Sequence, residues 1–177
     1  IASQVMLDKA ALLSGEHAGD IRKLLVDRGA IVIRGVFPDD AELRTIARTL
    51  GDLRIGAAKR GSDGKTLTEG EEGVLKVSLD PKVNPDYARF LFGNQLWHMD
   101  GTYSEKVPPF ATMLTPYALS QEGGDTLFAS TYAAFEDLPA DMQRRLEGYT
   151  VLHSLPAALF PAKQDVSAEE FAVWASY

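Results

Sequence analysis

The sequence predicts an α+β protein in which helices dominate the first third of the chain and short strands dominate the rest. Apolar residues recur at helical spacing in residues 14–50, and glycines follow the apolar runs. Later apolar segments are short, rich in β-branched residues and separated by proline and glycine turns, which is typical of a β-sandwich or barrel. Because 177 residues with 45% apolar content suffice for one sizeable core, we expect a single domain over residues 1–177.

Two helices and one strand are predicted in the N-terminal part. Residues 14–28 place apolar side chains at helical spacing, and Gly29 stands where a helix commonly ends. The segment AIVIRGV, residues 30–36, is short, β-branched and bounded by glycine, so it predicts a buried strand. A second helix is expected to begin at Pro38, and its apolar stripe is closed by Gly51.

A polar, glycine-rich segment covers residues 57–73, and we expect it to form a surface loop. Within it, Gly64, Lys65 and Thr66 resemble the end of a phosphate-binding loop. The first glycine of that motif is missing, because Lys59 stands at its position. Nucleotide binding is therefore not predicted here.

The second half of the chain is predicted to consist mainly of strands. The strand segments are residues 74–79, the residues around Trp97, and residues 111–117, 126–129 and 149–154. Two helices interrupt them: one begins near Ser130, and the other has Pro139 in its first turn and buries Met142. A last helix is predicted from Ser167, which forms a capping-box pattern with Glu170. Since no stop signal follows this helix, we expect the natural protein to continue.

Composition narrows the possible chemistry. The chain has no cysteine, so only histidine and carboxylate side chains are available to bind a metal. A net charge of -7 argues against nucleic acid as a partner. No segment approaches the roughly 20 apolar residues of a membrane span, and the first residues lack the features of a signal peptide. We expect a cytoplasmic protein with a small-molecule partner and neither nucleic acid nor membrane; formation of a homo-oligomer is left open.

The segment LWHMDGTY, residues 96–103, contains the most informative pattern. On an extended backbone, residues two apart project from the same face, so His98 and Asp100 are predicted to converge on one ion. One imidazole and one carboxylate are two of the three ligands in the facial triad that binds iron(II). The alternative is a pair of side chains that only hydrogen-bond to each other or to the backbone, because so short a motif also arises by chance.

A larger set of motifs surrounds this pair. In chain order they are Asn94, WHMD at residues 97–100 with Tyr103, Pro109, GGDT at residues 123–126, then Phe135 and Leu138. With AIVIRGV and with LGDL at residues 50–53, the sequence from about residue 20 to about residue 155 resembles the taurine dioxygenase and 2,4-dichlorophenoxyacetate dioxygenase family of iron(II)- and 2-oxoglutarate-dependent enzymes. The resemblance implies a double-stranded β-helix, that is, a cupin-like jelly roll, with flanking helices.

The resemblance also implies roles for four residues. His98 and Asp100 match the first two iron ligands and thus the catalytic centre. Thr126 matches the threonine that hydrogen-bonds the co-substrate carboxylate, although it is also compatible with an ordinary strand threonine. Asn94 matches a position that lines the substrate pocket, although it is also compatible with a turn former. The implied cofactor is Fe(II), with 2-oxoglutarate and O2 as co-substrates.

The family's third iron ligand and its co-substrate arginine have no match in the sequence. No histidine follows His153, and no arginine follows Arg145. We favour the explanation that residues 1–177 are a fragment that lacks the C-terminal strands of the jelly roll. The other explanation is that His153 is the third ligand and that Lys163 supplies the cation. His17 is expected to be a surface residue.

The implied activity is that of an oxidoreductase, a 2-oxoglutarate-dependent dioxygenase. Such an enzyme would hydroxylate a small anionic substrate next to a heteroatom and release succinate and CO2. Sulfonates, aryloxyalkanoates and N-substituted amino acids are the implied substrate classes. Lys76 and Arg89 are candidate partners for the anion, although Lys and Arg side chains are usually just solvated. The alternatives are a metal-free jelly-roll binding module and a cupin-like metalloenzyme that does not use 2-oxoglutarate.

Overall fold

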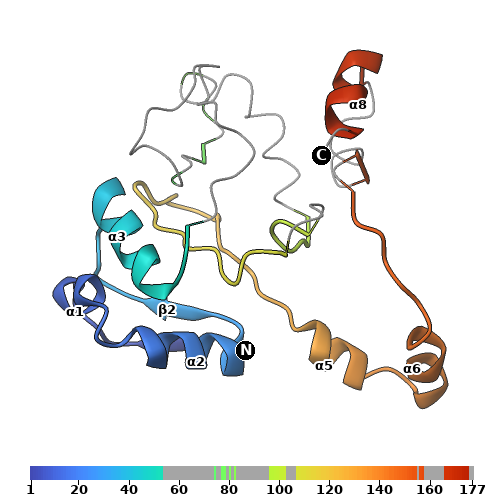
Figure 1. The fold of residues 1–177 in the computed structure, drawn as a ribbon, viewed down its shortest axis with the longest axis horizontal. Helices are drawn as coiled ribbons and strands as arrows, with labels where there is room; N and C mark the ends of the chain where they lie inside the picture. Colours follow the sequence, from blue (N-terminus) through green and yellow to red (C-terminus); the bar gives the residue numbers. More distant parts are fainter. Residues whose placement is uncertain are drawn as a thin grey trace. The chain divides into compact units, whose positions relative to one another are not determined.

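The structure, a computed structural model, describes residues 1–53, 74, 77–78, 80, 82, 96–102, 107–154, 156–157 and 166–175. The elements are β1 (Ser3–Val5), α1 (Lys9–Ser14), α2 (Ala18–Arg28), β2 (Ile31–Ile33), α3 (Asp40–Leu50), α5 (Thr131–Glu136), α6 (Ala140–Leu146) and α8 (Ala168–Ala175) (Figure 1). The chain divides into two compact units, Ile1–Leu53 with Met113–Thr150 and Arg54–Thr112 with Val151–Tyr177. The single domain inferred from the sequence stays a prediction.

The first unit contains a parallel pair of strands. Ser3 of β1 pairs with Ile31 of β2, and Val5 pairs with Ile33, while α1 and α2 make the crossover that a parallel connection needs. The predicted strand at residues 30–36 is thus confirmed but is shorter. It is also not fully buried: Ile31 and Ile33 pack against the core, and Val32, on the opposite face, is 39% exposed.

A small apolar core lies between these strands and the first three helices. Leu12, Ile21 and Ile46 are its buried centre, and α1, α2 and α3 contribute one each. In Figure 1 these helices gather around β2. The partly buried residues packed against the centre are Leu7, Leu13, Leu25, Ile31, Ile33, Val36 and Leu50. Burial of one stripe per helix therefore holds residues 1–53 of this unit together.

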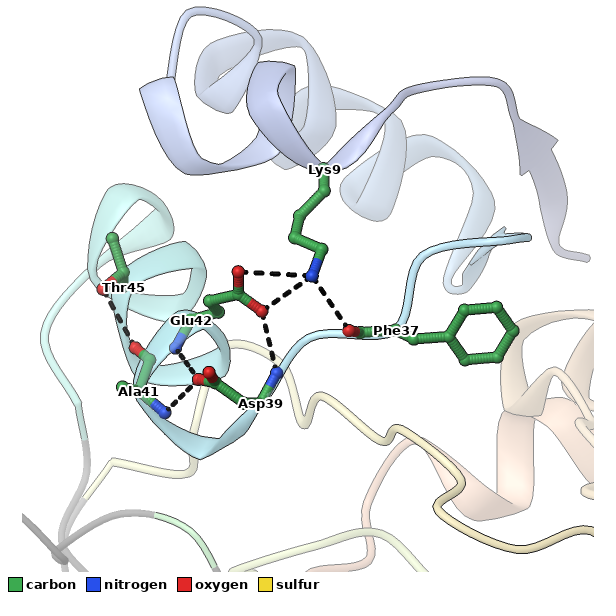
Figure 2. Close-up of polar contacts among 6 residues, drawn as sticks. All are labelled: Lys9, Phe37, Asp39, Ala41, Glu42 and Thr45. Atoms are coloured by element: carbon green, nitrogen blue, oxygen red, sulfur yellow. Dashed lines mark hydrogen bonds and ion pairs between the residues drawn. The ribbon is translucent and has the colours of Figure 1, made fainter.

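The N-terminus of α3 is tied to α1 by a set of polar contacts (Figure 2). Asp39 Oδ1 accepts hydrogen bonds from the N–H groups of Ala41 and Glu42 at 2.9 and 2.8 Å, and Glu42 Oε2 accepts one from the N–H of Asp39 at 2.9 Å. This is a capping box. Lys9 of α1 then donates to Glu42 Oε2 at 2.9 Å and to the carbonyl oxygen of Phe37 at 3.1 Å.

The helices follow the pattern that the sequence indicates, except that α1 was not predicted and the first predicted helix begins later. The stretch predicted as a helix over residues 14–28 is interrupted, because α1 ends at Gly15 with φ of 73° and α2 begins at Ala18. Gly29 and Gly51 end α2 and α3 as predicted. The predicted helices near Ser130, after Pro139 and after Ser167 are confirmed as α5, α6 and α8.

The predicted strands of the second half are not formed in the described residues. Residues 111–117, 126–129 and 149–154 and the described residues around Trp97 lack regular secondary structure. Strand ladders require a partner strand, and the described ranges provide no partner for these segments. The predicted loop at residues 57–73 and half of the strand predicted at residues 74–79 lie outside the described residues. The structure therefore does not confirm the jelly roll.

Burial in the second half also differs from the prediction. Met142 of α6 was expected in a core but is 37% exposed, and Leu127 and Leu152 are 69% and 91% exposed. Within the described part, the closely packed pairs of elements involve only β1, β2, α1, α2 and α3, so α6 has no comparable neighbour to cover it. In the same part of the chain, every helix is too short or too polar to cross a lipid bilayer.

Candidate metal centre

His98 and Asp100 lie side by side in the second unit. Nε2 of His98 is 3.4 Å from Oδ1 of Asp100. The local backbone is not a strand; it enters a turn at Asp100, and Gly101 has φ of 70°, which glycine adopts without strain. The side chains predicted to converge are therefore close together, although the backbone that brings them together differs from the predicted one.

The ring of His98 is oriented by the backbone of its own segment. Its Nδ1 lies 2.7 Å from the carbonyl oxygen of Leu96. Since a carbonyl oxygen can only accept, Nδ1 is the protonated nitrogen that donates. In the neutral ring Nε2 then carries the lone pair, and Nε2 is the nitrogen that faces Asp100. A ring held in this way is the usual arrangement of a metal-binding histidine.

The carboxylate of Asp100 is held in a similar way from another part of the chain. Thr112 Oγ1 donates a hydrogen bond to Oδ2 of Asp100 at 2.6 Å. Oδ1, the other oxygen, faces His98. Nδ1 of His98 and Oδ2 of Asp100 are thus each held by a hydrogen bond. The remaining polar atoms, Nε2 of His98 and Oδ1 of Asp100, face each other.

The two side chains fit the first two ligands of an iron(II) ion. Two atoms about 2.1 Å from one ion are roughly 3.0 Å apart at an angle of about 90° and roughly 3.4 Å apart at a tetrahedral angle, so the observed 3.4 Å suits two ligands of one ion with a widened angle between them. Imidazole nitrogen with carboxylate oxygen is a donor set that suits iron. The side chains are 46% and 49% exposed, so an ion and small co-substrates can reach them from solvent.

No third ligand joins the pair within the residues that the structure describes. Nowhere among those residues do three or more histidine and acidic side chains lie close enough together to hold a metal ion. His153 is described and exposed, and it forms no such group with His98 and Asp100. His17 is a surface residue, as predicted, and its Nε2 lies 3.2 Å from Glu16 Oε1.

The residues predicted to bind the co-substrate and the substrate are less well defined. Thr126 is exposed and follows a turn in which Gly123 and Gly124 have φ of 66° and 81°. It belongs to the first unit, whereas His98 and Asp100 belong to the second. Outside the described residues lie Asn94, Tyr103, Lys76, Arg89 and Lys163. The roles of Thr126 and Asn94 stay predictions.

The first unit also has a surface hollow of about 290 Å³, lined by Phe37, Pro38, Asp39, Thr115, Pro116 and Tyr117. The carboxylate of Asp39 is used by the capping box of α3. The phenol of Tyr117 donates a hydrogen bond to Asp40, which raises the pKa of Tyr117 above its ordinary value of 10.0. These polar groups hold the start of α3, so we assign the hollow no catalytic role.

Sequence reasoning missed the two groups that orient the pair, the Leu96 carbonyl and the Thr112 hydroxyl. A backbone carbonyl leaves no signal in a sequence. Thr112 is the one hydroxyl-bearing residue near the start of the apolar segment Ala111–Leu114, but a threonine is common in strands and by itself indicates no site. The contact with Asp100 joins residues 12 positions apart and is visible only in three dimensions.

Comparison with known proteins agrees with the motifs. Residues 2–175 match the family described as "Taurine catabolism dioxygenase TauD, TfdA family". The chain is 30% identical over 151 residues to the alpha-ketoglutarate-dependent 2,4-dichlorophenoxyacetate dioxygenase of Cupriavidus pinatubonensis. The aligned region covers 83% of this chain and 52% of the relative. It is 34% identical over 124 residues to the (S)-phenoxypropionate/alpha-ketoglutarate-dioxygenase of Sphingobium herbicidovorans, covering 68% of this chain and 40% of the relative.

A third relative acts on a different class of compound. It is the alpha-ketoglutarate-dependent sulfate ester dioxygenase of Pseudomonas putida, 30% identical over 99 residues, which are 49% of this chain and 33% of the relative. The chain spans about half the length, or less, of the curated relatives described here. No solved structure gives a significant match. Because the family match extends over nearly the whole sequence, this chain belongs to the TauD and TfdA family of dioxygenases, as its motifs predicted.

Proposed function

We propose that the full-length protein is an iron(II)- and 2-oxoglutarate-dependent dioxygenase in which His98 and Asp100 are two of the three iron ligands. The observation that carries the proposal is the 3.4 Å approach of His98 Nε2 to Asp100 Oδ1. Each of these side chains has its other polar atom engaged elsewhere, by the Leu96 carbonyl and by Thr112. Membership of a dioxygenase family supports the same conclusion.

The residues have distinct tasks in this proposal. His98 provides a neutral nitrogen and Asp100 a negative oxygen, and their half-exposed side chains leave room for other molecules beside the ion. Iron(II) with 2-oxoglutarate and O2 supplies the oxidising power for inserting oxygen into a C–H bond, with succinate and CO2 as the other products. Thr126 would bind the co-substrate carboxylate, and Asn94 would line the substrate pocket.

The missing parts of the site are assigned to the remainder of the protein. The relatives are about twice as long as the matched region, which supports a third histidine ligand and a co-substrate arginine outside residues 1–177. The C-terminal strands of the jelly roll would lie there as well. His153 is the alternative third ligand, but the described residues do not bring it to the pair.

The proposed substrate is a small organic anion that is hydroxylated next to a heteroatom. The names of the relatives support this class, because phenoxyacetate, phenoxypropionate and sulfate esters all combine a negative charge with an ether or ester oxygen. Taurine, in the name of the family, is a sulfonate. An aryloxyalkanoate, a sulfonate and a sulfate ester are therefore the first substrates to test. A small-molecule partner and a cytoplasmic location stay predictions from the sequence.

The test is an anaerobic titration of the full-length protein with iron(II) and then 2-oxoglutarate, in which the weak visible charge-transfer band of the chelate is recorded. We expect a band in the wild type and none in His98→Ala. His17→Ala is the matched control, because it removes a histidine of similar exposure from the surface of the first unit. This control should give the wild-type band.

The opposite result favours a metal-free binding module. A separation of 3.4 Å also suits an ion pair between Asp100 and a doubly protonated His98, without any metal ion. In that case the folded wild-type protein would give no band and would not retain iron(II). Metal binding without any response to 2-oxoglutarate would instead indicate a cupin-like metalloenzyme of another kind.

A further inference from the structure

We propose that Thr112 is a positioning residue of the metal centre, whose hydroxyl holds the Asp100 carboxylate so that Oδ1 alone faces the ion. This inference rests on the proposed function, because it concerns the same site. It goes further, because it assigns the orientation of the Asp100 carboxylate to a residue that itself binds neither the metal nor the substrate. The contact that carries it is the 2.6 Å hydrogen bond from Thr112 Oγ1 to Asp100 Oδ2.

The strength of this contact follows from its chemistry. A hydroxyl that donates to an ionised carboxylate makes a charge-assisted hydrogen bond, and such O–H···O⁻ bonds are about 2.5–2.7 Å long. The observed length falls within this range. Threonine is β-branched and has few allowed rotamers, so its hydroxyl loses little freedom when it makes the bond.

The consequence for a bound ion concerns the number of oxygens that Asp100 provides. A carboxylate has two oxygens and can bind a metal with one or both. A facial triad leaves three positions open for co-substrates only if each protein ligand occupies one position. Because Thr112 engages Oδ2, the second oxygen is held away from the ion, and the open positions are preserved.

Packing does not impose this orientation. The Asp100 side chain is 49% exposed, and Thr112 is itself exposed, so water competes for both oxygens. Without a donor at position 112, rotation of the carboxylate would exchange Oδ1 and Oδ2 freely. The hydrogen bond that His98 donates to the Leu96 carbonyl and the one that Asp100 accepts from Thr112 therefore act together, one for each ligand, as outer contacts do at other metal sites.

The experiment compares Thr112→Val, which keeps the shape and removes the donor, with Thr112→Ser, which keeps the donor. The full-length proteins are titrated with Co(II) by calorimetry, and the charge-transfer band of the iron(II) and 2-oxoglutarate complex is recorded. We expect Co(II) affinity in Thr112→Val to fall by about 10–100-fold and its band to shift, with Thr112→Ser close to the wild type. Thr150→Val is the control, since Thr150 is an exposed threonine in the other unit.

The outcomes separate this inference from the proposed function. A folded wild-type protein that binds no Co(II) and gives no band would refute the proposed function itself. A wild type that binds metal, together with a Thr112→Val variant of equal affinity and unchanged band, would overturn only the role of Thr112. An equal loss of Co(II) affinity in Thr112→Val and Thr112→Ser would overturn the role of Thr112 too, because the hydroxyl would then be irrelevant. If Thr112→Val is unfolded by circular dichroism, Thr112→Ala takes its place with the same expected result.

Discussion

His98 and Asp100 would contribute unequally to holding a cation. The neutral ring offers a lone pair, whereas the carboxylate offers a full negative charge. Asp100→Asn keeps the size of the side chain and an oxygen for Thr112 but removes that charge. We expect Co(II) affinity to fall by more than the roughly 10–100-fold of an outer-contact change. Calorimetric titration of the full-length variant measures the loss.

The matched control for that variant is Asp27→Asn, which neutralises an exposed aspartate on α2. It changes the net charge by the same amount and leaves the pair intact. Equal affinity losses in the two variants would mean that the effect comes from the overall charge of the protein and would contradict the assignment of Asp100 as a ligand.

Glu42 gives the first unit a specific sensitivity to acid. The hydrogen bond from the Asp39 N–H and the contact with Lys9 hold the pKa of Glu42 below its ordinary value of 4.5. A carboxyl whose pKa is lowered in the folded state stabilises that state above pH 4.5, and the contribution is lost as the pH falls through the folded-state value. We expect Glu42→Gln to be less stable than the wild type at neutral pH, and the difference to shrink below pH 4.5.

Urea unfolding of both proteins between neutral pH and pH 3 measures this effect. Gln still offers an oxygen to the Asp39 N–H, so the comparison isolates the charge of Glu42. A difference in unfolding free energy that stays constant over the whole range would show that the ionised form has no special role in the cap.

Sequence reasoning at this scale succeeded where the relation between residues is local. His98 and Asp100 are separated by one residue, so their proximity was predictable, although the extended backbone assumed in that prediction is replaced by a turn at Asp100. Thr112 was not identified, because its contact depends on how the chain returns to the site 12 residues later. The contact of Lys9 with Glu42, across 33 positions, was inaccessible for the same reason.

Glycines with positive φ end α1 and α2, but they differ in their surroundings. Gly15 and Gly29 have φ of 73° and 75°, so alanine is strained at both. A Cβ at Gly15 would also lie 3.0 Å from two carbon atoms of Thr49 on α3, whereas at Gly29 it would meet nothing within 4 Å. We expect Gly29→Ala to cost about 1–2 kcal/mol and Gly15→Ala to cost more.

Chemical denaturation of the two variants gives the comparison, and Gly19→Ala serves as the reference. Gly19 lies in the first turn of α2, has no positive φ and has open space around it, so alanine should be neutral or stabilising by up to about 1 kcal/mol. Equal losses at positions 15 and 29 would show that α3 moves away from Gly15 at no cost.

The elements that were predicted well are those that carry their own stop and start signals. α3 has an acidic cap, an apolar stripe and a terminal glycine, and the structure has it where the sequence placed it. Helix α1 was not predicted, and the helix predicted from residue 14 begins only at Ala18, after the turn at Gly15. Strands of the second half depend on partners elsewhere in the chain, and their apolar sequence alone does not specify those partners.

At the scale of the whole molecule, the described structure and the family match answer different questions. The core around Leu12, Ile21 and Ile46 explains how residues 1–53 are held together. The His98 and Asp100 pair lies in the second unit, which has fewer described residues. Membership of the family was predictable because it depends on the order of motifs along the chain. The contact of Thr112 with Asp100 was not predictable, because motif order contains no distances.

Ligand binding should couple the candidate metal centre to the stability of the whole protein. A ligand that binds only the folded state stabilises it by about 2.7 kcal/mol at a concentration 100 times its dissociation constant. We therefore expect Mn(II) with 2-oxoglutarate to raise the midpoint of thermal unfolding of the full-length protein, and a chelator to reverse the rise. Manganese is chosen because it is divalent like iron(II) and suits carboxylate ligands such as Asp100.

The decisive comparison for this linkage is again Asp100→Asn, measured by differential scanning calorimetry with and without the two ligands. If the ions act through the pair, the variant should show little or no increase, while Asp27→Asn should respond as the wild type does. An equal increase in all three proteins would mean that Mn(II) binds somewhere else. Since native-state binding at a half-exposed pair requires both ligand atoms at once, loss of the charge on one of them should abolish most of the stabilisation.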